Sequence, residues 1–350
     1  MSKATVICDL QYGSTGKGLI AGYLANNNPN FNVAVNANMP NAGHTYINHR
    51  GKVIFKVLPC AATSKDVRYI LLGPGSIFNP QRLLEEVVDL ENIRGDEEWQ
   101  VCVHPAAWFL NPDVHVDMEA QLMGLDIGST KQGVLGAMVE KISRAGPRGD
   151  FNVFNNYLHP RIKMVSRDSY RKILDWANQI LVEGAQGFSL GVHEQFYPYC
   201  TSRDCTPAQI MADCGIPLDY HAVTVGTART FPIRVGGDSG GWYPDQWETS
   251  WDEINQVEER TTVTNKIRRV ATFSYEQIDD AMWQCRPDYI FLNFVNYLND
   301  MTEAEEMFRR IELIGECHGE GVGVIRYMGF GPSHDDVEER DFGQIAKTYM

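Results

Sequence analysis

Short apolar runs that are rich in Val and Ile recur along the whole chain. They cover residues 5–8, 32–35, 53–57, 69–72, 101–103, 180–182, 222–225, 289–292 and 323–325. Continuous runs of β-branched residues are typical of strands that are buried on both faces of a sheet. We therefore expect these runs to be strands.

Helical patterns lie between several of the runs. Asn79 and Pro80 offer a cap and a first-turn proline ahead of apolar residues that share one helical face. Thr302 and Glu305 have the spacing of a capping box ahead of a second such pattern. Strands that alternate with helices predict an α/β fold with a central, largely parallel β-sheet flanked by helices. The chain shows no repeat or linker, so we expect residues 1–350 to form a single domain.

Charge and composition narrow the class of partner. The formal net charge is -14 and the pI is near 5.1, which disfavours nucleic acid and anionic membranes as partners. No apolar stretch approaches the roughly 20 residues that a membrane span needs, so a cytoplasmic protein is expected. The eight cysteines include no C-x-x-C pair, which predicts reduced and mostly buried thiols.

A glycine-rich loop follows the first predicted strand: Gly13-Ser14-Thr15-Gly16-Lys17-Gly18. Its glycines let backbone N–H groups approach an anion, the following helix points its positive end there, and Lys17 adds a charge. Its spacing fits neither G-x-x-x-x-G-K nor G-x-G-x-x-G. By itself the loop predicts phosphate binding or tight packing equally well.

A second polar stretch follows the run at 32–35. It reads Asn41-Ala42-Gly43-His44-Thr45 and places a histidine and an amide in one loop. Together with the glycine-rich loop, it resembles the adenylosuccinate synthetase family, whose P-loop-like fold has a central parallel sheet. Members of this family join aspartate to carbon 6 of a 6-oxopurine nucleotide and cleave a nucleoside triphosphate.

Further segments resemble the motifs of that family in the same order along the chain. They are residues 127–133 with Arg144, 183–187, 197–202, 233–237 and 262–269. Chance similarity is improbable for so many ordered motifs between residues 12 and 269.

The resemblance implies a role for each matching residue. His44 would be the acid at O6, Lys17 and Ser14 would be the other catalytic residues, and Ser14 with the Gly43 carbonyl would hold Mg²⁺. The purine monophosphate would contact Ser14, Asn41, Ala42, Ser129, Thr130, Arg144, Gln186, Thr201, Val235 and Lys266. The triphosphate would contact Gly13, Thr15, Gly16, Lys17, Gly18, Gly43, His44, Thr45, Arg268, Asn293, Asn296, Gly329, Gly331 and Pro332. L-aspartate would contact Thr262, Val263, Thr264, Lys266 and Arg268. A homodimer is implied, with Arg144 acting across the interface.

Ser14 departs from the family, which has an aspartate there that removes the N1 proton and ligates Mg²⁺. A neutral serine is a poor general base. Its smaller side chain leaves room for the 2-amino group that guanine carries and hypoxanthine lacks. The chain is therefore similar to a bacteriophage branch of the family that acts on dGMP to make 2-aminoadenine DNA, which would place it in the host cytoplasm.

Two other departures from the family concern the sugar of the purine monophosphate and the nucleoside triphosphate that donates the phosphoryl group. Lys266 stands at the arginine that approaches a ribose 2′-hydroxyl in the family, which suits a deoxynucleotide. The run Leu292-Asn293-Phe294-Val295-Asn296 lacks the acid with which relatives read the guanine of GTP. Without that acceptor ATP or dATP becomes the expected donor.

Two alternatives stay open at this stage. One is adenylosuccinate synthesis from IMP with GTP or ATP, in which water or another carboxylate such as Asp9 replaces the missing aspartate. The other is a purine-nucleotide-binding regulator without catalysis. Neither composition nor spacing identifies the group that deprotonates N1.

Overall fold

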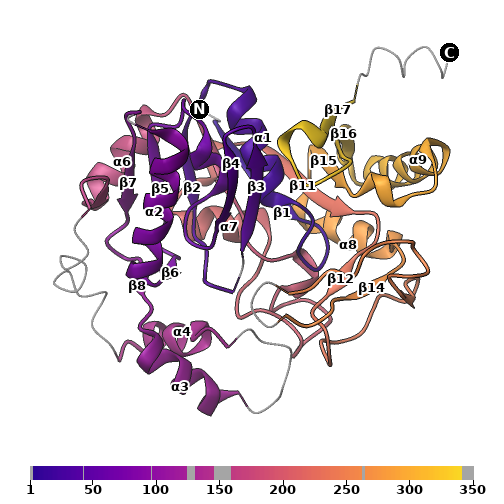
Figure 1. Ribbon diagram of the computed structural model, residues 1–350, viewed down its shortest axis with the longest axis horizontal. Coiled ribbons are helices and arrows are strands. Elements are labelled where there is room, and N and C mark those ends of the chain that lie inside the picture. The colour runs from indigo at the N-terminus through magenta and orange to yellow at the C-terminus, as the bar shows by residue number, and fades with distance from the viewer. Residues whose placement is uncertain are drawn as a thin grey trace.

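The computed structural model describes residues 3–41, 43–95, 97–123, 131–145, 159–261 and 265–340. Within this part of the chain, a ten-stranded sheet runs through the centre of the molecule (Figure 1). Its neighbouring strands are parallel except for the edge pair β16 and β17, which is antiparallel. In spatial order the strands are β17 (Val337–Glu339), β16 (Val324–Gly329), β15 (Tyr289–Asn293), β11 (His221–Arg229), β1 (Ala4–Asp9), β10 (Gln179–Glu183), β2 (Phe31–Asn36), β5 (Tyr69–Leu72), β7 (Gln100–Val103) and β9 (Ile162–Met164). The predicted α/β fold with a largely parallel sheet is confirmed.

Two hydrophobic cores cover the two faces of this sheet. Successive residues of a strand point to opposite faces, so Val6 and Cys8 lie in one core and Ile7 lies in the other. The first core is closed by α6 (Arg167–Trp176), α7 (Pro207–Cys214), α8 (Tyr275–Cys285) and α9 (Met301–His318). The second is closed by α1 (Lys17–Asn27), α2 (Pro80–Arg94) and the hairpin of β3 (His44–Asn48) and β4 (Gly51–Phe55).

The helix starts show how far local sequence decides structure. The Asn79 side chain accepts from the N–H groups of Gln81 and Arg82, so the predicted start of α2 is confirmed. The predicted start at Thr302 is wrong. Asp300 caps α9 by accepting from Glu303 N–H at 3.0 Å, and Thr302 already lies in the first turn.

The apolar run at 53–57 does not join the central sheet. Its first part is β4, which pairs antiparallel with β3 in a separate hairpin. The parallel-sheet interpretation of this run is therefore wrong. The other short elements are β6 (Ile77–Phe78), β8 (Trp108–Phe109), β12 (Ile233–Arg234), β13 (Glu248–Thr249), β14 (Arg269–Ala271) and the 3-10 turns Cys60–Thr63, Phe188–Leu190, Leu218–Tyr220, Val295–Tyr297 and His334–Asp336.

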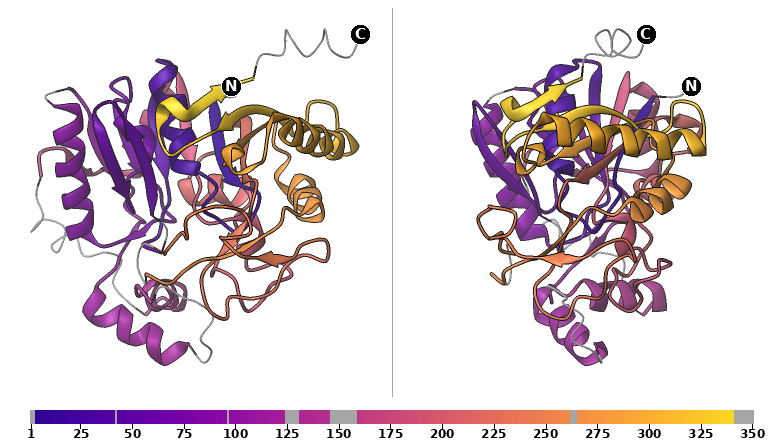
Figure 2. Two further views of the ribbon diagram at one scale, coloured as in Figure 1. Left: turned by 45° about the vertical axis from the view of Figure 1, so that its right-hand side comes forward. Right: turned by 90° about the vertical axis from the view of Figure 1, so that its right-hand side faces the viewer.

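Two small substructures lie beyond the carboxyl edge of the central sheet (Figure 2). One is the helical pair α3 (Pro112–Leu122) and α4 (Val134–Ser143), and the other is the small sheet β12–β14–β13. A parallel sheet places its ligand loops at this edge, and the two substructures extend the walls around it.

The burial of the cysteines agrees with the expectation from composition. Six of the eight cysteines are buried, Cys200 is half-buried and Cys317 is exposed. Among the described residues, no helix is both long and apolar enough to cross a membrane.

Candidate active site

A cleft of about 1150 Å³ opens at the carboxyl edge of the central sheet. Its walls come from segments that are far apart in the chain, including the loop after β1, the turn before β3 and the turns after β10, β15 and β16. Most of the residues chosen from the sequence line it: Gly13, Ser14, Thr15, Gly16, Lys17, Gly18, Asn41, Gly43, His44, Thr45, Gln186, Thr201, Val235, Arg268, Asn293, Asn296, Gly331 and Pro332. The fold therefore gathers the predicted site into one cavity.

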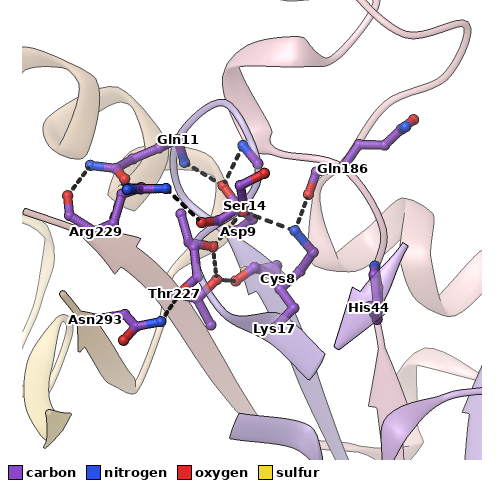
Figure 3. Close-up of polar contacts among 12 residues, drawn as sticks. Cys8, Asp9, Gln11, Ser14, Lys17, His44, Gln186, Thr227, Arg229 and Asn293 are labelled. Atoms are coloured by element: carbon purple, nitrogen blue, oxygen red, sulfur yellow. Dashed lines mark hydrogen bonds and ion pairs between the residues drawn. The ribbon is translucent and has the colours of Figure 1, made fainter. Parts of the chain in front are cut away.

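The loop between β1 and α1 is organised around the buried carboxylate of Asp9. One oxygen accepts from the N–H groups of Gln11 and Gly13 at 2.9 and 3.2 Å (Figure 3). The other accepts from the Thr15 hydroxyl and from Lys17 Nζ, the latter at 2.9 Å. Asp9 is only 1% exposed, so both oxygens are occupied inside the protein. Asp9 thus holds the loop in its curved shape.

Lys17 begins α1 beneath the cleft. Its ammonium donates to Asp9 and to the Gln186 carbonyl, the second at 2.7 Å. An ammonium has three donors, so these bonds leave one for a ligand. The residue before it, Gly16, adopts φ 96° and caps α1 without a side-chain hydrogen bond. The first N–H groups of the helix are therefore available to an anion, as the sequence predicts.

Gly16 is required by a close approach to the end of β15. A Cβ there would lie 2.4 Å from Asn293 Nδ2, and its φ is in the left-handed region. The Asn293 amide in turn donates to the Thr15 carbonyl at 3.3 Å. The phosphate loop is thereby tied to the strand end that the sequence assigns to the donor base.

His44 lies at the start of β3 and faces the cleft, although its side chain is almost fully buried. Its Nδ1 is hydrogen-bonded to the carboxylate of Glu183, at the end of β10. The second oxygen of Glu183 accepts from Cys60 N–H at 2.7 Å. Burial and the charge of Glu183 raise the pKa of the Cys60 thiol, which keeps that thiol neutral.

Ser14 sits at the mouth of the loop with its side chain exposed to the cleft. Its φ of 57° is in the left-handed region, which Asp and Asn also tolerate. Its carbonyl accepts from Arg229 Nη1 at 3.3 Å. The position departs from the family in its side chain, and the backbone there suits an aspartate as well.

Arg229 joins three parts of the cleft. Its side chain is fully buried and pairs with Glu259 at 2.5 Å. The guanidinium carbon lies 3.9 Å from the centre of the Phe294 ring. The Arg268 N–H donates to the Glu259 carbonyl at 2.8 Å, so the ion pair fixes the segment that carries Arg268. Burial lowers the pKa of Arg268, and Glu259 opposes that shift.

Gln186, Thr201 and Val235, which are expected to contact the purine monophosphate, also line the cleft. The Thr201 hydroxyl donates to the Gln186 side chain at 2.5 Å, so these two polar groups lie in contact. Val235 follows Arg234, whose guanidinium carbon lies 4.6 Å from the Tyr12 ring centre and 4.9 Å from that of Phe196. Burial raises the pKa of the Tyr12 hydroxyl.

Not every predicted residue lies in the cleft. Arg144 and Lys266 are exposed and do not line it, and Gly329 lies behind the wall, where a Cβ would be 2.1 Å from Asn293 Oδ1. The predicted residues Ala42, Ser129, Thr130, Thr262, Val263 and Thr264 lie outside the described residues.

Comparison with known proteins decides the family. A profile of the adenylosuccinate synthetase family matches residues 6–174 and 149–306. The N6-succino-2-amino-2'-deoxyadenylate synthase of Vibrio phage phiVC8 is 45% identical, over 97% of this chain and 99% of its own length. The enzyme of the same name from Cyanophage S-2L is 40% identical, over 96% of this chain and 92% of its own length. This chain belongs to the adenylosuccinate synthetase family.

Solved structures agree with this assignment. The structure of the Cyanophage S-2L succinoaminodeoxyadenylate synthetase, bound to dGMP and to dATP as an energy donor, is 37% identical with a TM-score of 0.87. It covers 100% of this chain and 99% of its own. A fully ligated adenylosuccinate synthetase from Plasmodium falciparum is 19% identical, with a TM-score of 0.79. The match covers 97% of this chain and 100% of that protein's chain, so the two share the fold.

The sequence does not single out several residues of this site. The sequence predicts Glu183 only as the first residue of the 183–187 motif, and it offers Asp9 only as a substitute base. No motif selects Arg229 or Glu259. Each is a charged residue at or near a predicted strand end or motif, which was the available signal. Their partners lie 8 to 139 residues away along the chain, so only the fold shows which charges pair.

Proposed function

We propose that this protein is a carbon–nitrogen ligase that uses ATP or dATP to join L-aspartate to C6 of dGMP. The products are N6-succino-2-amino-2'-deoxyadenylate, phosphate and the nucleoside diphosphate. The observation that carries the proposal is Ser14, a small hydroxyl-bearing residue that opens onto the cleft from the phosphate loop. The names of the phage relatives and the dGMP-bound structure of one of them support it.

Ser14 favours an aminated purine for a steric and a chemical reason. A serine occupies less space than an aspartate beside N1, which leaves room for the exocyclic 2-amino group. Its hydroxyl can accept a hydrogen bond from that amino group or donate one elsewhere. Hypoxanthine has no such group and gains nothing from the added space.

The reaction requires activation of O6, because the oxygen of a lactam is a poor leaving group. N1 would lose its proton as the γ-phosphoryl group passes to O6, and the nucleoside diphosphate would be released. The aspartate amine would then attack C6, O6 would leave as phosphate, and the nitrogen would lose a proton. His44 would donate to the charge that develops on O6, while Lys17 and the first N–H groups of α1 hold the phosphoryl group.

Two oxygen-bearing groups of the cleft suit a magnesium ion. The Ser14 hydroxyl and the Gly43 carbonyl both belong to residues that line the cleft, and Mg²⁺ takes oxygen ligands together with substrate phosphates. When bound, the ion would neutralise charge on the transferring phosphoryl group.

Asp9 does not fit the role of replacement base. Both of its oxygens already accept two hydrogen bonds each inside the loop, and it does not line the cleft. Deprotonation by Asp9 would require breaking the bonds that shape the phosphate loop. The mechanism therefore does not use Asp9 as the base at N1.

The donor side of the cleft favours adenine over guanine. Asn293 and Asn296 line it, and Asn296 is exposed there. Neither can offer the paired carboxylate oxygens that accept from guanine N1–H and its 2-amino group. Gly331 and Pro332 complete this side.

The remaining contacts extend the same proposal. Arg268 lines the cleft and offers a guanidinium fork to an aspartate carboxylate. Arg144 is exposed at the C-terminal end of α4 and off the cleft, which suits a role in the site of a partner copy. The active form would then be a homodimer.

Product analysis tests this function directly. The enzyme would be incubated with L-aspartate, each of dGMP and IMP, and each of ATP, dATP and GTP, and products followed by mass spectrometry. We expect succinylated product from dGMP with ATP or dATP. We also expect Ser14→Asp to lower kcat/KM for dGMP more than for IMP, since its backbone tolerates aspartate.

A matched control distinguishes the effect of a carboxylate inside the cleft from the effect of an added negative charge elsewhere on the protein. Ser166 caps α6 outside the cleft, and Ser166→Asp adds the same charge while keeping a good N-cap. This variant should behave like the wild type. Preferred use of IMP by the wild type, or unchanged dGMP turnover in Ser14→Asp, would refute the proposal.

A further inference from the structure

We infer that Glu183 is the positioning residue of the active site: it fixes the imidazole of His44 so that Nδ1 carries a proton and Nε2 serves the substrate. The inference rests on the proposed role of His44 at O6. Glu183 itself does not line the cleft and so does not touch a ligand. It acts only through His44.

The contact geometry carries the first step. Glu183 ends β10, and His44 begins β3, so two rigid elements meet at this bond. A carboxylate can only accept, so the shared proton belongs to Nδ1 of His44. The other ring nitrogen, Nε2, is then the atom that exchanges a proton or hydrogen bond with the substrate.

Burial of both side chains keeps Glu183 as the partner of His44 Nδ1. The Glu183 side chain is inaccessible and that of His44 is 6% exposed, so water cannot replace either partner. The second Glu183 oxygen is held by Cys60 N–H at 2.7 Å, which prevents the carboxylate from rotating away. A ring that is held by a carboxylate with both of its oxygens bonded needs little reorganisation when charge develops at O6.

The carboxylate also supports the charged form of the ring. Because Nδ1 keeps its proton, His44 can donate to O6 through Nε2 only as a cationic imidazolium, and the negative group at Nδ1 stabilises that cation. The arrangement has the logic of a carboxylate–histidine pair, in which the carboxylate orients the ring without itself reacting. Glu183 would thus place a negative charge beside the ring at the moment when the ring donates to O6.

Replacing Glu183 by glutamine removes the negative charge and one acceptor oxygen without changing the size of the side chain. Gln has one acceptor oxygen where Glu has two, and its amide nitrogen is a donor. In Glu183→Gln, either His44 or the Cys60 N–H must face an NH₂ group. The side-chain volume is unchanged, so packing stays the same while orientation and charge are lost.

The matched control is Glu86, another buried carboxylate. It accepts from the N–H groups of Lys56, Val57 and Leu58 at 2.7 to 2.9 Å and does not line the cleft. Glu86→Gln therefore loses a buried acceptor without touching His44. Any effect it shares with Glu183→Gln is structural.

The first readout is steady-state kinetics with dGMP, aspartate and the triphosphate. We expect Glu183→Gln to lower kcat about 10²-fold, the lower end of general acid catalysis, with both nucleotide KM values unchanged. Glu183→Asp should recover part of the loss because it keeps the charge. In a His44→Ala background, Glu183→Gln should have no further effect.

The second readout needs no turnover. Nitrogen-15 NMR of histidine-labelled wild-type enzyme without substrate should show His44 with its proton on Nδ1 when neutral. A proton on Nε2, wild-type kcat in Glu183→Gln, or additive losses in the His44→Ala background would overturn the inference. If instead dGMP is no substrate at all, the NMR result still decides the role of Glu183 while the proposed function fails.

Discussion

The buried pair of Asp9 and Lys17 leads to a quantitative prediction. Asp9→Asn keeps the shape and one oxygen, which can still accept from Gln11 and Gly13. The other oxygen becomes an NH₂ group that faces Lys17, whose side chain is only 5% exposed. Removing one partner of a buried ion pair costs about 3–5 kcal/mol, because the other charge stays buried without a counter-charge. We expect a loss of about 3 kcal/mol in the free energy of unfolding, since the Gln186 carbonyl still accepts from Lys17.

Urea unfolding followed by tryptophan fluorescence measures this loss. Lys17→Met in the Asp9→Asn background should restore about 1–3 kcal/mol, because the unpaired charge is gone. The control Asp245→Asn removes a carboxylate that accepts from the Tyr275 and Glu276 N–H groups outside the cleft, with no lysine partner. It should cost only about 1 kcal/mol. An Asp9→Asn enzyme as stable as the wild type but inactive would refute this reasoning and make Asp9 a base.

Two further predictions concern the loop and the response to acid. Gly16→Ala places a Cβ 2.4 Å from Asn293 Nδ2 on a residue whose φ is 96°. We expect it to lower the free energy of unfolding by at least about 1 kcal/mol and to raise the KM for the triphosphate. The control is Gly241→Ala, whose Cβ would have nothing within 4 Å, and it should change neither quantity. Burial, with Arg167, Lys141 and Arg171, lowers the pKa of His104 to about 4. A depressed folded pKa gives stability above pH 6.5 that is lost as pH falls towards 4, so the urea midpoint should drop over this range, and less so in His104→Asn.

The fold was largely predictable because its determinants are local and periodic. Buried parallel strands need apolar runs, and Asn79 with Pro80 satisfies the N-terminus of α2 from adjacent residues. The prediction failed where a neighbour offered an equivalent group. Asp300 caps α9 two residues before Thr302, and the two acceptors cannot be ranked from spacing alone.

The site was predictable wherever a motif is contiguous. The loop at 13–18 and the segment at 43–45 both line the cleft. The contacts between motifs were not predictable, as the run at 53–57 illustrates. Its apolar character is real, but it packs as β4 of a hairpin against β3, and that hairpin places His44 over the second core.

By itself, the sequence determined the α/β class, the family and the departure at Ser14, because periodicity and contiguous motifs are written in adjacent residues. Only the tertiary structure decided how charges are partnered: Asp9 with Lys17, Glu183 with His44 and Glu259 with Arg229. Glu183 and His44, like Glu259 and Arg229, come from segments that meet only in the folded chain, and Asp9 meets Lys17 only once the loop between β1 and α1 has taken its curved shape. Electrostatic interactions depend on distance and burial, and neither quantity exists until the chain is folded.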